Sequence, residues 1–290
     1  MNKVLDSISL CTFSTGGSLV REVLGDWLSF LGGRPAQVLF AITPPSGYPP
    51  VYDELRREGV IDRLIPVETR ERSVREIDAE ALRLVVDAAP TNWVLLLKLD
   101  TLPFRSGHDS WLEEAIQLVQ RHELFGMTGG FLIPDLVPLE RGYSVTQKYS
   151  NNFSIFRKAE WLKVIGATVD QGHDPAGALD CRFQGDNLRF INEFAIETYL
   201  QGTGGKMLVR HDSLDWSVFH VNVWGNALRD VRESYIRRRR VTRFFNTGKP
   251  QRRPLLYPWQ KYYGFPRPPA LRLMRIVLGR WRRELFGIKG

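Results

Sequence analysis

Apolar and polar positions form two kinds of block along the first 132 residues. Short, nearly continuous apolar runs, typical of buried strands, fall at residues 4–13, 37–43, 63–68, 93–100 and 125–132. Segments whose apolar residues recur at helical spacing separate these runs, at residues 18–31, 52–59, 73–89 and 111–122. This alternation predicts an α/β fold with a mostly parallel central sheet and helices on both faces.

The pattern loosens after Pro134. Residues 151–166 have the pattern of a short strand followed by a helix, and residues 192–205 and 206–210 that of a further helix and strand. The polar, glycine-containing stretch 167–190 is predicted to be a loop or flap. The prediction is one α/β domain over residues 1–228, with halves at about 1–132 and 133–228.

Residues 229–290 differ from the rest of the chain in charge. The chain has 40 Lys and Arg against 32 Asp and Glu, and much of the +8 excess lies in this segment. A basic helical pattern at 230–245 leads through a proline-rich connector to an amphipathic stretch at 271–288. We predict a basic helical C-terminal extension with an acidic partner: a membrane surface, a nucleic acid or a pyrophosphate-bearing substrate.

The amphipathic stretch 271–288 allows two interpretations. Its arginines lie largely on one side, and Trp281 and Phe286 lie on the apolar side. Such a helix suits peripheral contact with an anionic membrane, and it suits equally well a helix packed on the domain with its arginines outward. No nucleic-acid recognition motif accompanies the basic residues, so no specific nucleic-acid partner is expected.

Cysteine usage and the lengths of the apolar runs bear on location. Cys11 and Cys181 are far apart and form no CxxC pair, which argues against a thiolate zinc site or a disulfide framework and favours a reducing compartment. The N-terminal stretch lacks a signal-peptide pattern, and no uninterrupted apolar run approaches the ~20 residues of a membrane span. We expect a cytoplasmic protein, either free or at the inner face of the cell membrane.

Asp100 is the first candidate for chemistry. It ends the most apolar of the predicted strands, in Lys98-Leu99-Asp100-Thr101-Leu102. Ligands of open α/β sheets bind beyond the carboxyl ends of the strands, and a carboxylate there can hold Mg²⁺ or Mn²⁺ together with phosphate oxygens. The alternative is a turn residue that precedes Pro103.

The order of elements around Asp100 resembles the family-2-type glycosyltransferases with the GT-A fold. Asp100 stands where that family has an Asp-x-Asp motif, and Asn192-Glu193 opens a later helix where the family has a Glu-Asp pair. The resemblance covers roughly residues 4–225. Leu102 replaces the second Asp of the motif, so a metal would need another ligand or would not be required.

The resemblance implies a role for each of several residues. Glu193 would be the catalytic base, with Glu197 one helical turn later in reserve, and Asp100 and His220 would hold Mn²⁺ or Mg²⁺. A hydrogen-bonded core histidine is the alternative for His220. The donor would contact Thr12, Ser14, Glu68, Arg75, Lys98 and Asp100. By residue type, Tyr149, His173 and Trp216 are the candidates on the acceptor side, and the alternative for the two aromatic residues is a place in the core.

The implied function is sugar transfer from a nucleoside-diphosphate sugar to a hydroxyl of a glycan or lipid-linked acceptor. A single base with in-line attack implies inversion at the anomeric carbon. The donor would occupy about residues 1–132 and the acceptor about 133–228. The alternatives are a nucleotidyltransferase, which also places carboxylates on such a sheet, and a non-catalytic GT-A-like binding protein, suggested by the incomplete Asp-x-Asp motif.

Overall fold

The structure of the protein is a computed structural model that describes most of the first 236 residues. The predicted sites Ser14 and His173, and the extension beyond residue 236, lie outside the described part. The described residues are 4–13, 17, 19–42, 48–68, 74–130, 136–170, 192–210, 213–221 and 225–236.

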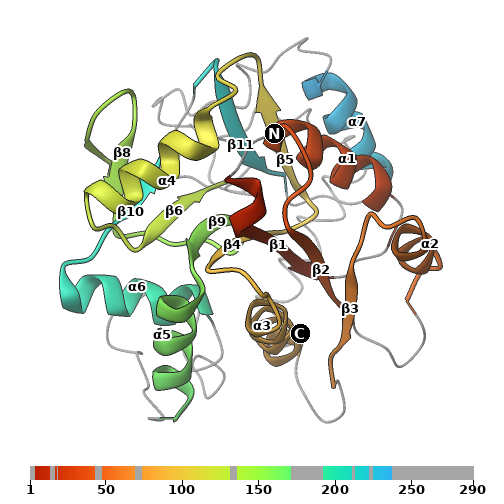
Figure 1. The fold of residues 1–290 in the computed structure, drawn as a ribbon, viewed down its shortest axis with the longest axis horizontal. Coiled ribbons are helices and arrows are strands. Elements are labelled where there is room, and N and C mark those ends of the chain that lie inside the picture. Colours follow the sequence, from red (N-terminus) through yellow and green to blue (C-terminus); the bar gives the residue numbers. More distant parts are fainter. Residues whose placement is uncertain are drawn as a thin grey trace, which may run out of the picture.

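A nine-stranded sheet forms the centre of the molecule (Figure 1). Strands β9 and β8 run antiparallel to their neighbours, and the other strands share one direction. The predicted mostly parallel α/β sheet is therefore confirmed. The strands, in spatial order, are β3 (Arg63–Pro66), β2 (Gln37–Ile42), β1 (Ile8–Phe13), β4 (Trp93–Leu97), β9 (Phe153–Arg157), β6 (Gly126–Gly129), β10 (Met207–Val209), β8 (Ser144–Thr146) and β7 (Val137–Pro138).

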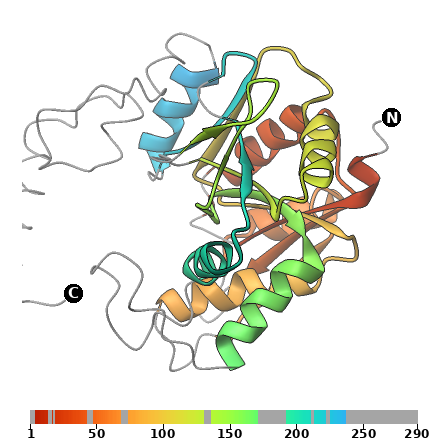
Figure 2. The ribbon, with the colours of Figure 1, turned by 90° about the vertical axis from the view of Figure 1, so that its left-hand side faces the viewer.

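Helices cover both faces of this sheet, as the sequence predicts (Figure 2). One face packs against α1, α2 and α4, and the other against α3, α5 and α6. Side chains of a strand point alternately to the two faces. The sequence of β4 is apolar throughout because helices cover both of its faces. The helices are α1 (Val20–Leu31), α2 (Val51–Arg57), α3 (Val74–Asp87), α4 (Trp111–Arg121), α5 (Lys158–Asp170), α6 (Asn192–Thr203) and α7 (Gly225–Ile236).

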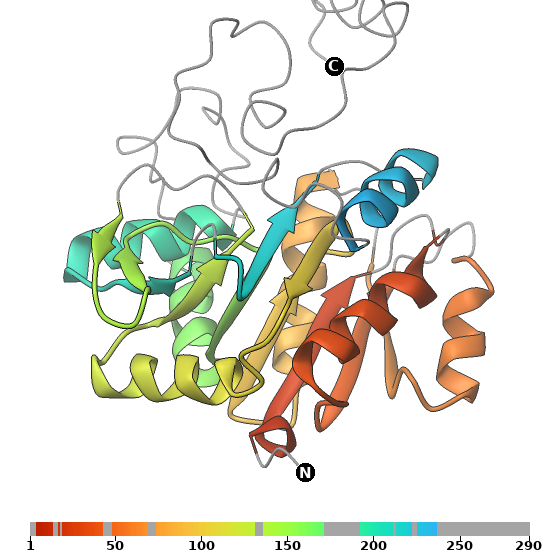
Figure 3. The same cartoon turned by 90° about the horizontal axis from the view of Figure 1, so that it is seen from above.

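The strand predicted over residues 93–100 is shorter than expected and is followed by a second one. β4 ends at Leu97, and after a turn the chain enters β5 (Thr101–Arg105), which pairs antiparallel with β11 (Trp216–His220) in a separate two-stranded sheet. In the sequence, Pro103 argues against a strand at residues 101–105, because proline lacks an amide donor and is confined to edge strands. This small sheet lies beside α1 and α7 (Figure 3).

Helix α7 crosses the predicted domain boundary between residues 228 and 229. Leu228 and Val231 are buried in the same core cluster as α1. Arg232 donates two hydrogen bonds to Asp26 of α1, at 2.6 and 2.8 Å. The described part of the predicted extension therefore belongs to the α/β body. The helix expected at 230–245 begins earlier, at Gly225.

Replacing Arg232 with Ala should lower the free energy of unfolding by about 1–2 kcal/mol, since it removes a partly buried, charge-assisted pair. Chemical denaturation of the two proteins measures the difference. Arg229→Ala is the matched control on the same helix, because Arg229 donates only to Asn226 of its own helix among the described residues. An equal loss in both variants would show that the Asp26 contact does not anchor α7.

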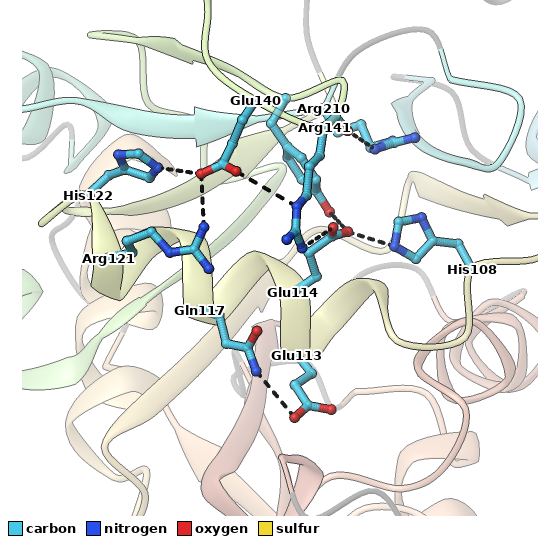
Figure 4. Close-up of polar contacts among 10 residues, drawn as sticks. His108, Glu113, Glu114, Gln117, Arg121, His122, Glu140, Arg141 and Arg210 are labelled. Carbon is cyan, nitrogen blue, oxygen red and sulfur yellow. Dashed lines mark hydrogen bonds and ion pairs between the residues drawn. The ribbon is translucent and has the colours of Figure 1, made fainter.

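A polar network fastens the turn between β7 and β8 to α4 (Figure 4). Glu114 accepts hydrogen bonds from Tyr143 Oη and Arg141, both at 3.2 Å, and its other contact is His108 Nε2 at 2.6 Å. Glu140 of the same turn contacts Arg121 and His122 near the end of α4. The hairpin is thus held at several points on one helix.

None of the described helices combines the length and apolarity needed to cross a membrane.

Candidate functional site

The carboxyl edge of the parallel strands gathers polar residues from several distant segments. The amide of Lys98, just after β4, donates to Asn152 O at 3.1 Å, just before β9. The amide of Val221, just after β11, donates to Asp100 O at 2.9 Å. These contacts bring the end of β4, the start of β9 and the end of β11 together. We call this region the edge site and define it by Asp100, Thr101, Asn151, Glu193 and His220.

Asp100 and His220 meet in the edge site although 120 residues separate them. His220 Nε2 lies 3.0 Å from Asp100 Oδ2. The β5–β11 register causes this approach, since it sets His220 opposite Thr101. The Asp100 side chain is only 3% exposed, and that of His220 is 21% exposed. One ligand nitrogen and one carboxylate therefore lie together at the sheet edge.

The turn that carries Asp100 is fixed by hydrogen bonds on both sides. The amide of Thr101 donates to Lys98 O at 3.0 Å, and the indole of Trp27 donates to Thr101 O at the same distance. Trp27 is buried and stacks on Phe153, with ring centroids 5.6 Å apart. The backbone of the Asp100 turn is thus held both by Lys98, directly after β4, and by a buried residue of α1.

Several buried oxygens of this region have no hydrogen-bond partner among the described residues. They are Asp100 Oδ1, Thr101 Oγ1, Asn151 Oδ1 and Thr12 Oγ1. A buried polar atom left without a partner costs about 1–3 kcal/mol, and native proteins satisfy almost all of them. The unpartnered oxygens therefore indicate a place for a polar ligand, an ion or water.

Gly130 closes one side of the edge site. Its backbone is left-handed, at φ +76°, a conformation that favours glycine. A Cβ at this position would lie 3.4 Å from Thr101 Cγ2 and 3.7 Å from His220 Cβ. These are ordinary van der Waals distances, so the backbone conformation, rather than a lack of space, favours glycine at this position.

Glu193 reaches the edge site from the first turn of α6. Its Oε1 accepts hydrogen bonds from the amide of Asn151, at 2.8 Å, and from Ser150 Oγ, at 3.4 Å. Ser150 is itself fixed, because its amide donates to Thr128 Oγ1 at 3.1 Å. Among the described residues, the hydrogen bonds of this carboxylate all go through Oε1.

Glu197, the reserve base, is engaged differently. It is buried, and it accepts hydrogen bonds from Lys148 Nζ, at 2.8 Å, and from the amide of Tyr149, at 3.3 Å. Burial raises its pKa, and the charge of Lys148 opposes that shift. This carboxylate is thus tied to a neighbouring ammonium, which leaves Glu193 as the candidate base.

The two aromatic residues expected on the acceptor side are both buried in this structure. Tyr149 is 2% exposed, and its hydroxyl accepts a hydrogen bond from Trp161 Nε1 at 2.9 Å. Trp216 is 1% exposed and packs against Trp111, with ring centroids 4.6 Å apart. Phe156 packs against the Tyr149 ring, and the Arg210 guanidinium lies over the Trp216 ring, 5.9 Å from its centroid.

The expected donor contacts are distributed along the same edge. Thr12 is buried near the end of β1, beside the end of β4, and Lys98 is half-buried in the Asp100 turn. Glu68 is exposed after β3, which two strands separate from β4, roughly 14 Å at the usual strand spacing. Arg75 lies in the first turn of α3, and its side chain is outside the described part.

Thr101, Asn151, Ser150 and Gly130 are not among the site residues expected from the sequence. A signal exists for two of them: Ser150-Asn151-Asn152 is a run of small polar residues directly before an apolar strand. Such a run at a strand end is typical of a loop whose side chains face a site. Thr101 and Gly130 can be recognised only from the structure, which places β11 and β6 beside the Asp100 turn.

The residues present fit a divalent cation in part. Asp100 offers a buried, unpartnered carboxylate oxygen, and His220 offers an imidazole nitrogen. No three His, Cys, Asp or Glu side chains gather at one point in the part of the chain that the structure describes. A cation here would take further ligands from phosphate oxygens and water, as Mg²⁺ commonly does, and the imidazole favours Mn²⁺.

Comparisons with known proteins give remote similarities. No family model and no curated protein matches the chain. Among solved structures, TarS of S. aureus gives a TM-score of 0.40 at 16% identity, with 73% of this chain and 60% of that chain covered. A Pyrobaculum calidifontis mannosyltransferase in complex with GDP-Man and Mn²⁺ gives 0.46 at 13%, covering 79% and 61%.

A third similar structure is a UDP-glucose pyrophosphorylase, with a TM-score of 0.44 at 10% identity and coverage of 80% and 99%. This chain thus spans about three fifths of the TarS and mannosyltransferase chains. At TM-scores below 0.5 and identities of 16% or less, these similarities assign neither a family nor an activity to this chain.

Proposed function

We propose that this chain is a glycosyltransferase that moves a sugar from a nucleoside-diphosphate sugar to a hydroxyl of a glycan or lipid-linked acceptor, with inversion. The observation that carries the proposal is the approach of Asp100 and His220 at the carboxyl edge of the sheet, where Asp100 Oδ1 is buried and has no partner among the described residues. Ligands of open α/β sheets bind at this edge. The proposal adopts the GT-A-type arrangement that the motif order suggests.

The donor half of the proposal uses the Asp100 turn. Sugar transfer leaves negative charge on the departing diphosphate, which must be stabilised. Asp100 and His220 would hold Mn²⁺ or Mg²⁺, which supplies positive charge to that diphosphate. Lys98, half-buried two residues before Asp100, would contribute a further cation. The unpartnered hydroxyls of Thr12 and Thr101 would bond to the donor.

The acceptor half uses Glu193. A hydroxyl is a weak nucleophile, so a carboxylate must take its proton during attack. The hydrogen bonds from Asn151 and Ser150 hold Oε1 in place, and Oε2 would take the proton. A single base acting in line with the leaving diphosphate gives inversion.

Isothermal titration with a panel of UDP, GDP and dTDP sugars, with and without Mn²⁺, tests the proposal. We expect one nucleotide class to bind with a Kd of about 1 µM to 1 mM, and more tightly with Mn²⁺. Absence of binding to every nucleotide would overturn it. Binding without turnover on any acceptor would favour a GT-A-like binding protein, and formation of the nucleotide sugar from a nucleoside triphosphate would favour a nucleotidyltransferase.

The predicted cytoplasmic location and the contact with anionic membrane stay predictions. The residues that suggest membrane contact, 271–288, lie outside the described part. Binding of the full chain to vesicles with and without anionic lipid would examine that contact separately.

A further inference from the structure

A pocket of about 290 Å³ lies between the β7–β8 hairpin and the C-terminal end of α6. Its size is at the lower end of the range of small-molecule sites. Two valines of the β7–β8 hairpin form an apolar side. The polar lining consists of Thr146, Gln147, Lys148, Gln201 and Lys206.

The charge of this lining is positive. Among the described residues, this lining contains two lysines and no carboxylate. Lys148 is paired with Glu197, so its charge is balanced. Lys206 is exposed, and it forms no ion pair with the described residues. The pocket therefore offers one uncompensated ammonium, together with side-chain amides that can bond to hydroxyls or to carboxylate and phosphate oxygens.

The pocket is joined to the edge site through α6. Residues 147–151 run along this helix and contact three successive turns. Gln147 donates to Leu200 O, Lys148 to Glu197 and the amide of Asn151 to Glu193. Gln201 of the pocket and Glu193 of the edge site are eight residues apart on this helix, about 12 Å along its axis. One extended ligand can span that distance.

We propose that this pocket binds an anionic group, a carboxylate or a phosphate, carried by the acceptor at a position remote from the reacting hydroxyl. The assignment to the acceptor rests on the proposed glycosyl transfer, and the binding of an anion does not. Lys206 supplies the charge, and Gln147, Gln201 and Thr146 supply hydrogen bonds to the group and its neighbouring hydroxyls. Remote binding of this kind orients the acceptor at the site of reaction.

Direct titration tests the pocket without any nucleotide. The probes are glucuronate, inorganic phosphate and, as the neutral match, glucose. Either anion should bind, glucose should bind at least about tenfold more weakly, and binding should weaken with added salt. The anion with the lower Kd, glucuronate or phosphate, shows whether the pocket prefers a carboxylate or a phosphate group. Equal binding of glucose and both anions, or no binding by any probe, would overturn the proposal.

Variants assign that binding to the pocket. Lys206→Ala should weaken anion binding about tenfold, the effect of one charge-assisted hydrogen bond, and Lys206→Arg should retain most of it. Lys163→Ala is the matched control, because Lys163 is an exposed lysine of α5 outside the pocket. Unchanged binding in Lys206→Ala, with an unchanged melting temperature, would contradict the proposal. Since no nucleotide is present, that result would leave the proposed transfer reaction untouched.

Discussion

Replacing Glu193 with Gln should lower kcat by about 10²–10⁴-fold while the Kd for the nucleotide sugar stays unchanged. The loss is the usual contribution of a positioned general base. Glutamine keeps the size of the side chain, and its amide oxygen can still accept from Asn151 and Ser150. The variant should therefore fold normally and bind the donor. Steady-state kinetics together with donor titration by calorimetry separate the two effects.

Two further variants make the Glu193 result specific. Glu113→Gln changes an exposed glutamate of α4, whose described contact is Gln117, and it should leave kcat unchanged. Glu197→Gln breaks the pair with Lys148, so its main effect should be a lower free energy of unfolding. A full loss of turnover in Glu197→Gln, with normal turnover in Glu193→Gln, would transfer the role of base to Glu197.

Replacing Asp100 with Asn should lower kcat by about 10²–10³-fold, the effect of removing one group that stabilises charge in a transition state. The affinity for Mn²⁺ in the presence of nucleotide should fall at least about tenfold. Titration of Mn²⁺, followed by its electron paramagnetic resonance signal, measures this affinity. The matched control is Asp109→Asn, because the Asp109 side chain is 93% exposed and lies outside the edge site.

Asp100→Asn should not lower the thermal stability of the ligand-free protein. The carboxylate is buried, and one of its oxygens has no partner among the described residues. Such a charge costs free energy in the folded state unless a ligand compensates it. A stable but inactive variant would therefore agree with a binding role. A variant with a strongly reduced melting temperature would instead make Asp100 a structural turn residue.

The sequence is sufficient to predict the parallel part of the sheet, because its strands are continuous apolar runs separated by amphipathic helices. It fails where a strand has an unusual composition or a distant partner. β5 contains Pro103 and pairs only with β11, more than 100 residues later. The hairpin β7–β8 has strands of two and three residues, which are too short to show a periodicity.

The edge site, too, could be predicted only in part from the sequence. Asp100 is found as a carboxylate at a strand end, and His220 as its partner only through the resemblance to a family. The position of Glu193 depends on the backbone amide of Asn151, 42 residues away, and every residue type except proline has such an amide. The burial of Tyr149 and Trp216 could not be predicted either, because an aromatic side chain has the same signature in a core as on a binding surface.

The pairing of β5 with β11 also determines when the edge site can exist. Asp100 and His220 come together only after the chain closes a loop of 120 residues, a step that carries a large entropic cost and slows folding. A ligand bound to both side chains would stabilise the closed form of that loop. Local opening of the small sheet would then release the ligand, and ligand binding would suppress that opening.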